Sequence, residues 1–123
     1  MLYAILCYHD EAAVGAWTQE QDAACMARIG VVLDGLAGAG RLGPVARLVP
    51  TSAAVTLRKG REDIVLDGPF AETKEQLLGF YVVDCATLDD AVAAAKELAH
   101  ANPGLGAYEL RPVAYFRAGG EAG

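Results

Sequence analysis

The chain has 123 residues, of which 54% are hydrophobic and 21% charged, so it is expected to fold as one globular domain around a single core. Its formal net charge of −6 argues against electrostatic attraction to nucleic acid or to an anionic membrane. The opening MLYAILCYHD has no basic leader, and no apolar run approaches the ~20 residues of a membrane span. We therefore expect neither a signal peptide nor a membrane segment.

The cysteines indicate a reducing compartment. Cys7, Cys25 and Cys85 are odd in number and have no Cys-x-x-Cys spacing, which is typical of free thiols in a cytoplasmic protein. We expect all three thiols to be free and buried, Cys7 and Cys85 on strands and Cys25 on the inner face of a helix.

The first half of the chain predicts a strand, a helix, a strand and a hairpin. Residues 2–8 are aromatic and aliphatic throughout and predict the first strand. Thr18 to Gln21 form a capping-box pattern, after which apolar residues recur at helical spacing until a group of glycines. A second strand is expected over 41–49, and Lys59-Gly60 indicates the tip of a hairpin.

The second half repeats the order of strand and capped helix. Residues 77–85 are nearly all apolar and predict a strand, and Thr87 to Asp90 repeat the capping pattern. The helix that follows is expected to end at Asn102-Pro103-Gly104, and residues 106–116 predict the last strand. Two β-α-β units with a hairpin inserted between them are typical of an α+β, ferredoxin-like sandwich.

The apolar pattern of the strands also predicts an oligomer. We expect one domain over residues 1–117 and a flexible tail over 118–123. Two helices can cover only one face of the sheet, yet strands 2–8 and 77–85 are apolar on both faces. The economical cover for the second face is the same sheet of another copy, so we expect a homodimer.

The stretch DGPFAETKEQLLGFYVVD, residues 67–84, resembles the signature of the DGPF group within the YCII-related family. The likeness extends to LYAILCYHDE near the N-terminus, to TLDDAVAAA in the second helix and to ELRPV at 109–113. The motif DGPFAETKE is long and unusual in composition, which makes it specific. The resemblance implies a dimeric α+β barrel related to the ferredoxin-like fold.

The resemblance implies less about activity. Some relatives resemble small dehydrohalogenases or muconolactone-isomerase-like enzymes, and DGPF domains often occur beside extracytoplasmic-function sigma factors. A His–Asp pair, with the His on the first helix, is the active site proposed for the wider family. In this chain that helix reads EQDAACMARIGVVLDGL and contains no His, so only His9, at the end of the first strand, could replace it.

Asp67 and His9 are the candidate catalytic residues. Asp67 precedes Gly68-Pro69, where it either caps a turn, the role that the pattern favours, or acts as a base at the edge of a cleft. A lone His such as His9 is more often a surface residue at a strand end than a catalyst. Cys7-x-His9 could supply two metal ligands, but no second pair follows at zinc spacing, so we expect no metal site.

Phe70 and Lys74 are candidate substrate-binding residues within the DGPFAETKE motif. We expect this segment to cross the edge of an inter-sheet cleft, with Phe70 packed inward and with Asp67 and Lys74 near a pocket. Lys74 either lies on a solvated surface, as short polar runs usually do, or meets an anionic substrate or a carboxylate of the partner subunit.

Arg111 and Tyr81 complete the candidate substrate-binding set. Arg111 shares one face of the last strand with Glu109, which favours a structural ion pair over capture of a ligand carboxylate. Tyr81 is expected in the core or in a cleft wall, where its hydroxyl needs a partner if it is buried.

Two classes of function follow from these residues. The first is a cofactor-free, lyase- or isomerase-like enzyme acting on a small organic anion in the inter-sheet cleft, which requires converging polar groups. The second is a non-catalytic dimeric binding or regulatory module associated with sigma-factor transcription control, which requires an exposed apolar patch larger than the dimer needs. No GxGxxG motif opens a helix after a strand and no Walker lysine loop is present, so no nucleotide or flavin cofactor is expected.

Overall fold

A computed structural model describes residues 1–120 of the chain. The last three residues of the expected tail, 121–123, lie outside the described residues. The elements are β1 (Leu2–Asp10), α1 (Glu11–Gly15), α2 (Gln19–Gly38), β2 (Leu42–Arg47), the short 3-10 helix η1 (Thr51–Ala53), β3 (Val55–Arg58), β4 (Ile64–Asp67), β5 (Glu75–Asp84), α3 (Leu88–Ala101) and β6 (Gly106–Pro112).

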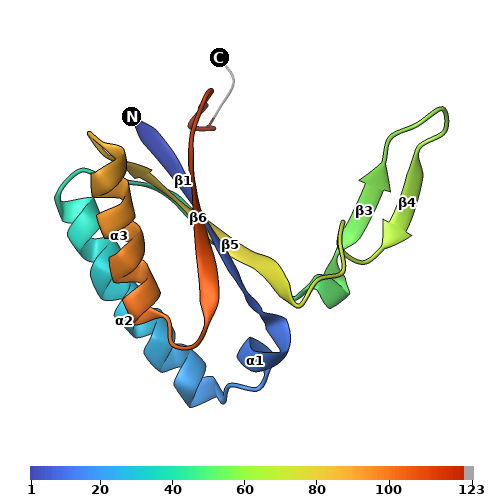
Figure 1. Ribbon diagram of the computed structural model, residues 1–123, viewed down its shortest axis with the longest axis horizontal. Coiled ribbons are helices and arrows are strands. Elements are labelled where there is room, and N and C mark those ends of the chain that lie inside the picture. Colours follow the sequence, from blue (N-terminus) through green and yellow to red (C-terminus); the bar gives the residue numbers. More distant parts are fainter. Residues whose placement is uncertain (121–123) are drawn as a thin grey trace.

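The main sheet is antiparallel, with four strands in the order β2-β5-β1-β6, and β3 pairs only with β4 in a separate two-stranded sheet. Both long helices, α2 and α3, lie on one face of the main sheet (Figure 1). The molecule is therefore α+β, consistent with the expected ferredoxin-like sandwich. No helix within the described residues is long and apolar enough to span a membrane.

The capping patterns mark the helix starts as expected. The backbone N–H of Gln21 donates to the Thr18 hydroxyl at 3.0 Å, and the Gln21 side chain accepts from the Thr18 N–H at 2.9 Å. At α3 the Asp90 N–H donates to the Thr87 hydroxyl at 3.1 Å. Helix α1 was not predicted, because one turn of helix carries no periodicity; the Asp10 carboxylate caps it by accepting from the Ala12 N–H at 2.9 Å.

The last strand is shorter than expected. It ends at Pro112, whereas the sequence predicted strand through residue 116. Pro112 has no N–H to give to a ladder, and its partner strand β1 begins at Leu2, so the pairing runs out there. The Val113 N–H makes a final bond to the Leu2 carbonyl at 2.9 Å.

The core lies between the main sheet and the two long helices. Alternate residues of β1 point to the helices, and Ile5 on this strand is fully buried. The largest fully buried side chains are Ile5, Val83, Cys85 and Leu98. All three cysteines are free and buried, as the sequence predicted, but Cys85, expected on a strand, lies one residue beyond the end of β5.

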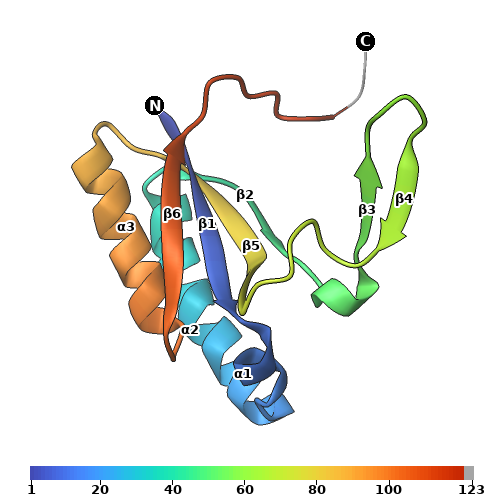
Figure 2. The same cartoon turned by 45° about the vertical axis from the view of Figure 1, so that its right-hand side comes forward.

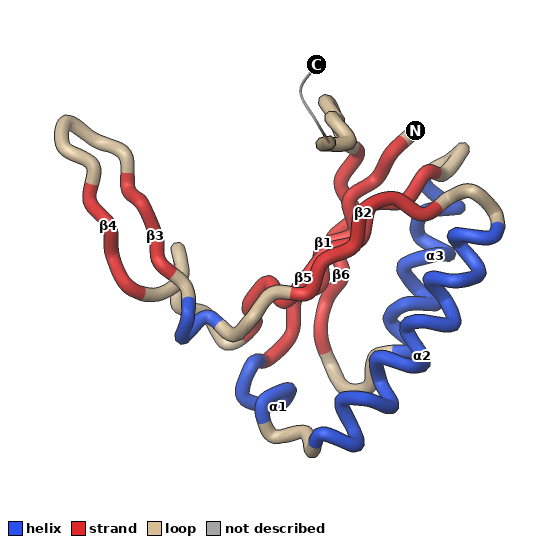
Figure 3. Tube along the Cα trace, turned by 180° about the vertical axis from the view of Figure 1, so that it is seen from behind, coloured by secondary structure: helices blue, strands red, loops and turns tan. Residues whose placement is uncertain are grey.

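The opposite face of the main sheet carries neither long helix, as the view from behind shows (Figure 3). We call it the open face, and the cross-strand pairs Leu6–Phe80 and Ala4–Val82 lie on it. Leu6 and Phe80 are half-buried, whereas the equivalent positions on the helix side are buried. The open face is thus apolar at its centre, as the pattern of strands 2–8 and 77–85 predicted.

The β3–β4 hairpin, residues 55–67, stands away from the main sheet on the side opposite the helices (Figure 2). We call it the arm. Its strands pair from Val55 with Asp67 to Arg58 with Ile64. Every residue of the arm is exposed except Thr56, which is half-buried. The arm therefore contributes nothing to the core.

Candidate functional site

A cleft of about 570 Å³, which we call the outer cleft, opens between α1, the start of α2 and the chain that follows β2. Beneath it, between α2 and the main sheet, lies an inner cavity of about 90 Å³. The two spaces share the side chains of Val14, Trp17, Asp22, Arg47 and Leu78. These five residues form the boundary between a solvent-facing cleft and an apolar interior.

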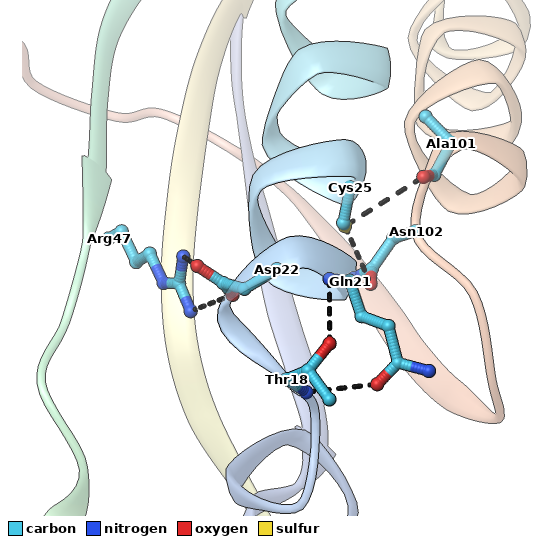
Figure 4. Close-up of polar contacts among 7 residues, drawn as sticks. All are labelled: Thr18, Gln21, Asp22, Cys25, Arg47, Ala101 and Asn102. Atoms are coloured by element: carbon cyan, nitrogen blue, oxygen red, sulfur yellow. Dashed lines mark hydrogen bonds and ion pairs between the residues drawn. The ribbon is translucent and has the colours of Figure 1, made fainter.

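An ion pair occupies this boundary. The two guanidinium nitrogens of Arg47 donate to the two carboxylate oxygens of Asp22, Nη1 to Oδ2 at 3.1 Å and Nη2 to Oδ1 at 2.7 Å (Figure 4). The hydrogen bonds from Arg47 lower the pKa of Asp22, and those to Asp22 raise the pKa of Arg47. The side chains of Arg47 and Asp22 remain 49% and 37% exposed, so water screens the pair and it adds little stability.

The local sequence explains how these two charges meet. The cap at Thr18 fixes the start of α2, which places Asp22 in its first turn. Arg47 ends β2 and pairs with Gly79 of β5. A Cβ atom at position 79 would lie 2.6 Å from the Ala46 carbonyl oxygen, so only glycine allows β2 to approach this closely.

Apart from Asp22 and Arg47 at the boundary, the polar groups that line the inner cavity carry no charge. The Asn102 amide accepts a weak bond from the Cys25 thiol at 3.6 Å and donates to the hydroxyl of Tyr108, which does not line the cavity, at 2.9 Å. Burial raises the pKa values of the Cys7 and Cys25 thiols, and it raises the pKa of Tyr81 to about 12. All three side chains therefore stay protonated near neutral pH, and the cavity favours an apolar guest.

His9 is 4% exposed, so the expected surface position at the strand end is wrong. Its ring meets Trp17 edge-on with centroids 6.0 Å apart. Nδ1 lies 3.3 Å from the Asp10 carbonyl and Nε2 lies 3.3 Å from the Pro103 carbonyl. The loop after α3 folds over the ring, since a Cβ atom at Gly104 would come within 3.1 Å of it. His9 thus packs against Trp17 and lines neither the outer cleft nor the inner cavity.

Phe70 does not pack inward, because its side chain is 76% exposed in this chain. The segment that carries it joins the arm to β5, where no helix or sheet of the described chain lies over it, and its ring contacts the Arg58 guanidinium at 5.4 Å instead. Asp67 is also exposed, and its carboxylate has no hydrogen-bond partner within residues 1–120. The turn after it is made by the backbone: Gly68 takes a φ of +102° and its N–H donates to the Ala54 carbonyl at 2.8 Å.

Lys74 and Arg111 lie apart from the outer cleft and from each other. Lys74 is 84% exposed, and its Nζ lies 3.9 Å from a carboxylate oxygen of Asp10 in the same chain. Arg111 forms the expected ion pair with Glu109, at 2.6 Å, and the Tyr8 hydroxyl donates to Glu109 at 3.4 Å. Of the six residues proposed from the sequence, only Tyr81 lines the inner cavity.

Sequence reasoning missed all five residues of the boundary, among them Trp17, Asp22 and Arg47. The capping box gave one signal, because it placed Asp22 at the start of a helix. Nothing local connected Asp22 with Arg47, which is 25 residues further along the chain. Their meeting depends on how α2 crosses the sheet.

The comparisons with known proteins agree with the motif. The family model described as YCII-related domain matches residues 1–117, which is nearly the whole chain. The chain is also 57% identical over 120 residues to a protein of Rhizobium meliloti (strain 1021) named Uncharacterized protein R00369, and the match covers 97% of both chains. Because the family model covers nearly the whole chain, the chain belongs to the YCII-related family.

Proposed function

We propose that this protein binds a small organic anion at Arg47 and acts on it as a cofactor-free, lyase- or isomerase-like enzyme. The observation that carries the proposal is the two-bonded Arg47–Asp22 pair between an open cleft and an apolar cavity. The anionic end of the ligand would lie at the guanidinium, and its apolar end would enter the inner cavity.

The geometry of Arg47 favours a carboxylate as the anion. Its two nitrogens already hold the carboxylate of Asp22 in parallel bonds, and a ligand carboxylate has the same shape and charge. Because the pair is exposed, exchanging one carboxylate for another costs under about 1 kcal/mol in lost pairing.

The two volumes limit the size of the ligand. The outer cleft, about 570 Å³, falls within the ~300–1,000 Å³ of small-molecule sites. The inner cavity, about 90 Å³, is smaller than the ~150 Å³ cavity that admits benzene. A short aliphatic group fits it, and an aromatic ring does not. The favoured ligand is therefore a short-chain carboxylic acid.

A base for proton transfer can arise from the exchange of partners. The hydrogen bonds from Arg47 lower the pKa of Asp22. A ligand that binds Arg47 in place of Asp22 removes these bonds, so the pKa of Asp22 rises and its carboxylate becomes more basic beside the bound anion. The Cys7 and Cys25 thiols, with raised pKa values, are protonated and poor nucleophiles. Asp22 thus replaces His9 and Asp67 as the proposed base, because neither of those borders the cleft.

Calorimetric titration with straight-chain carboxylates from acetate to hexanoate tests the proposal. We expect saturable binding that is strongest for a short chain and at least tenfold weaker in Arg47→Gln. Arg41→Gln is the matched control, since it removes an exposed arginine just before the same strand. Equal binding by the parent and Arg47→Gln would show that the anion site lies elsewhere.

A second candidate function is a non-catalytic regulatory module in the cytoplasm, associated with sigma-factor control. The exposed apolar side chains of the arm favour it, because a module needs a docking surface beyond the sheet. Incubation with short-chain carboxylates that a lyase or an isomerase can convert, a 3-hydroxy acid and a 3-alkenoic acid, separates the two functions. Recovery of both acids unchanged supports the module, whereas loss of water from the first or migration of the double bond in the second supports the enzyme.

We also propose that two copies pair through their open faces to form a dimeric α+β barrel. The apolar centre of this face, at Leu6, Ala4, Phe80 and Val82, supports the proposal because an antiparallel sheet that faces water usually carries polar residues there. Sedimentation at micromolar concentration tests it, and a monomer would contradict it.

A further inference from the structure

We propose that the arm is an interaction surface for a second copy of this chain and packs against the partner subunit that covers the open face. This inference rests on the homodimer proposed above, but not on the anion site. It concerns residues 55–67, which neither the core nor the outer cleft uses.

The arm cannot be stable by its own contacts. A two-stranded hairpin is marginal in water, and neither β3 nor β4 packs extensively on another helix or strand within residues 1–120. Its base is held by two bonds: the Thr56 hydroxyl donates to the Gly68 carbonyl at 2.9 Å, and the Gly68 N–H donates to the Ala54 carbonyl at 2.8 Å. Something beyond these contacts must order its strands.

One face of the arm is mostly apolar, and the other is mixed. Leu57 and Val65 are cross-strand partners on one face, 59% and 66% exposed, and Val55 lies beside them at 65%. Ile64 and Leu66 lie on the other face, 55% and 47% exposed, opposite the polar side chains of Arg58 and Thr56. A hairpin that meets solvent on one side carries polar residues there, as this second face does in part. The pattern therefore predicts cover over the face of Val55, Leu57 and Val65.

The position of the arm indicates what covers it. It stands on the same side of the main sheet as the open face, at some distance from it (Figures 2 and 3). A second subunit placed on the open face therefore lies beside the arm. One partner then covers both the half-buried apolar centre of the open face and the exposed apolar face of the arm.

The charge of the arm is compatible with a second copy as the partner. The arm carries three cations and three carboxylates, at Arg58, Lys59, Arg61, Glu62, Asp63 and Asp67, so it is neutral. The rest of the chain, which we call the body, carries the whole net charge of −6. Two acidic bodies repel one another, whereas a neutral arm approaches the acidic body of a partner without this repulsion.

The approach to the arm is fixed to the body, which lowers the entropy lost on docking. The Glu11 carboxylate accepts from the backbone N–H of Thr51 at 2.7 Å and from its hydroxyl at 2.6 Å. These bonds attach the chain just before β3 to the start of α1. The arm is thus held out from the body rather than left on a free linker.

Sedimentation of matched variants tests the role of the arm. Leu57→Asp and Val65→Asp each place a charge on one face of the arm, and because both positions are exposed in the single chain the protomer should still fold. We expect each to raise the dimer dissociation constant at least tenfold. Val31→Asp is the control, since Val31 is 72% exposed on α2, on the helix side; we expect a change within twofold.

Hydrogen exchange of the parent protein provides a second readout that needs no substitution. The β3 and β4 amides should exchange more slowly as protein concentration rises through the dimer dissociation constant. The arm inference fails if the arm variants dimerise as tightly as the parent and the exchange rates of the β3 and β4 amides do not change with protein concentration. The sheet-to-sheet dimer would still stand in that case. If the parent is a monomer, both fail. Neither result bears on the proposal that carboxylates bind at Arg47, which the calorimetric titration tests separately.

Discussion

Strands β1 and β3 both carry apolar residues, yet those facing the helices in β1 are buried and those in β3 are exposed. Ile5 in β1 is fully buried beneath α2 and α3, whereas Leu57 in β3 is 59% exposed. The difference lies in their neighbours, because β1 pairs on both edges and has helices over one face, while β3 pairs only with β4. Apolar composition therefore specified a strand in both regions, but a core in only one.

The largest expected effect contrasts a leucine of the body with a leucine of the arm. Leu98 in α3 is fully buried, so Leu98→Ala should lower the free energy of unfolding by about 2–5 kcal/mol. Leu57→Ala, measured in urea at a protein concentration low enough to keep the chain monomeric, should lower it by less than about 0.5 kcal/mol. Similar losses would mean that the arm folds onto the body.

The cap of α2 should show a smaller effect within the body. Thr18→Ala removes the bond from the Gln21 N–H to the Thr18 hydroxyl but keeps the backbone bond to the Gln21 side chain, and it should cost about 1 kcal/mol in urea unfolding. Ser52→Ala is the control, because Ser52 is exposed and lies in the connection to the arm. A cap variant as stable as this control would show that packing alone sets the helix start.

The boundary ion pair should give a small effect that depends on pH. Arg47 lowers the folded-state pKa of Asp22 below its ordinary 3.8, so the stability it adds is present above that value and is lost as pH falls through the folded pKa. Near neutral pH, Asp22→Asn should cost under about 1 kcal/mol, since the pair is exposed. The difference from the parent should vanish in acid. Asp34→Asn, on the exposed side of α2, should show no such trend.

Phe70→Ala should affect the isolated chain less than an inward-packed aromatic would. An inward-packed Phe70, as expected from the sequence, would lower the free energy of unfolding by a few kcal/mol when replaced. Because Phe70 is 76% exposed, only its contact with Arg58 is lost, which is worth about 0.5–1 kcal/mol. Thermal unfolding of the dilute monomer measures this. A larger loss there would place Phe70 in contact with the body.

Lys74→Ala should have the smallest effect. The Lys74 side chain is 84% exposed and 3.9 Å from Asp10, a weak surface pair whose loss changes stability by less than about 0.5 kcal/mol. The sequence also predicted weaker anion binding for this variant. Because Lys74 does not line the outer cleft, we now expect carboxylate affinity to be unchanged in calorimetric titration.

The sequence by itself determined the local elements and the family. Hydroxyls at Thr18 and Thr87 with their partners three residues on marked both long helices, and the motif DGPFAETKE carried the family resemblance. Nearly continuous apolar runs predicted the first strand and the strand over 77–85, and the odd number of cysteines without Cys-x-x-Cys spacing predicted free thiols. These signals could be read because capping, turn chemistry and side-chain alternation act between residues close in the chain.

The tertiary structure alone decided the site. The pairing of Arg47 with Asp22, the burial of His9 under the loop after α3 and the exposure of Phe70 each depend on segments distant in sequence. A charged or aromatic residue has no fixed environment of its own, because its burial is set by which elements pack over it. The single chain places helices over one face of the sheet and none over the arm, and from that arrangement follow both the cleft and the surface left for a partner.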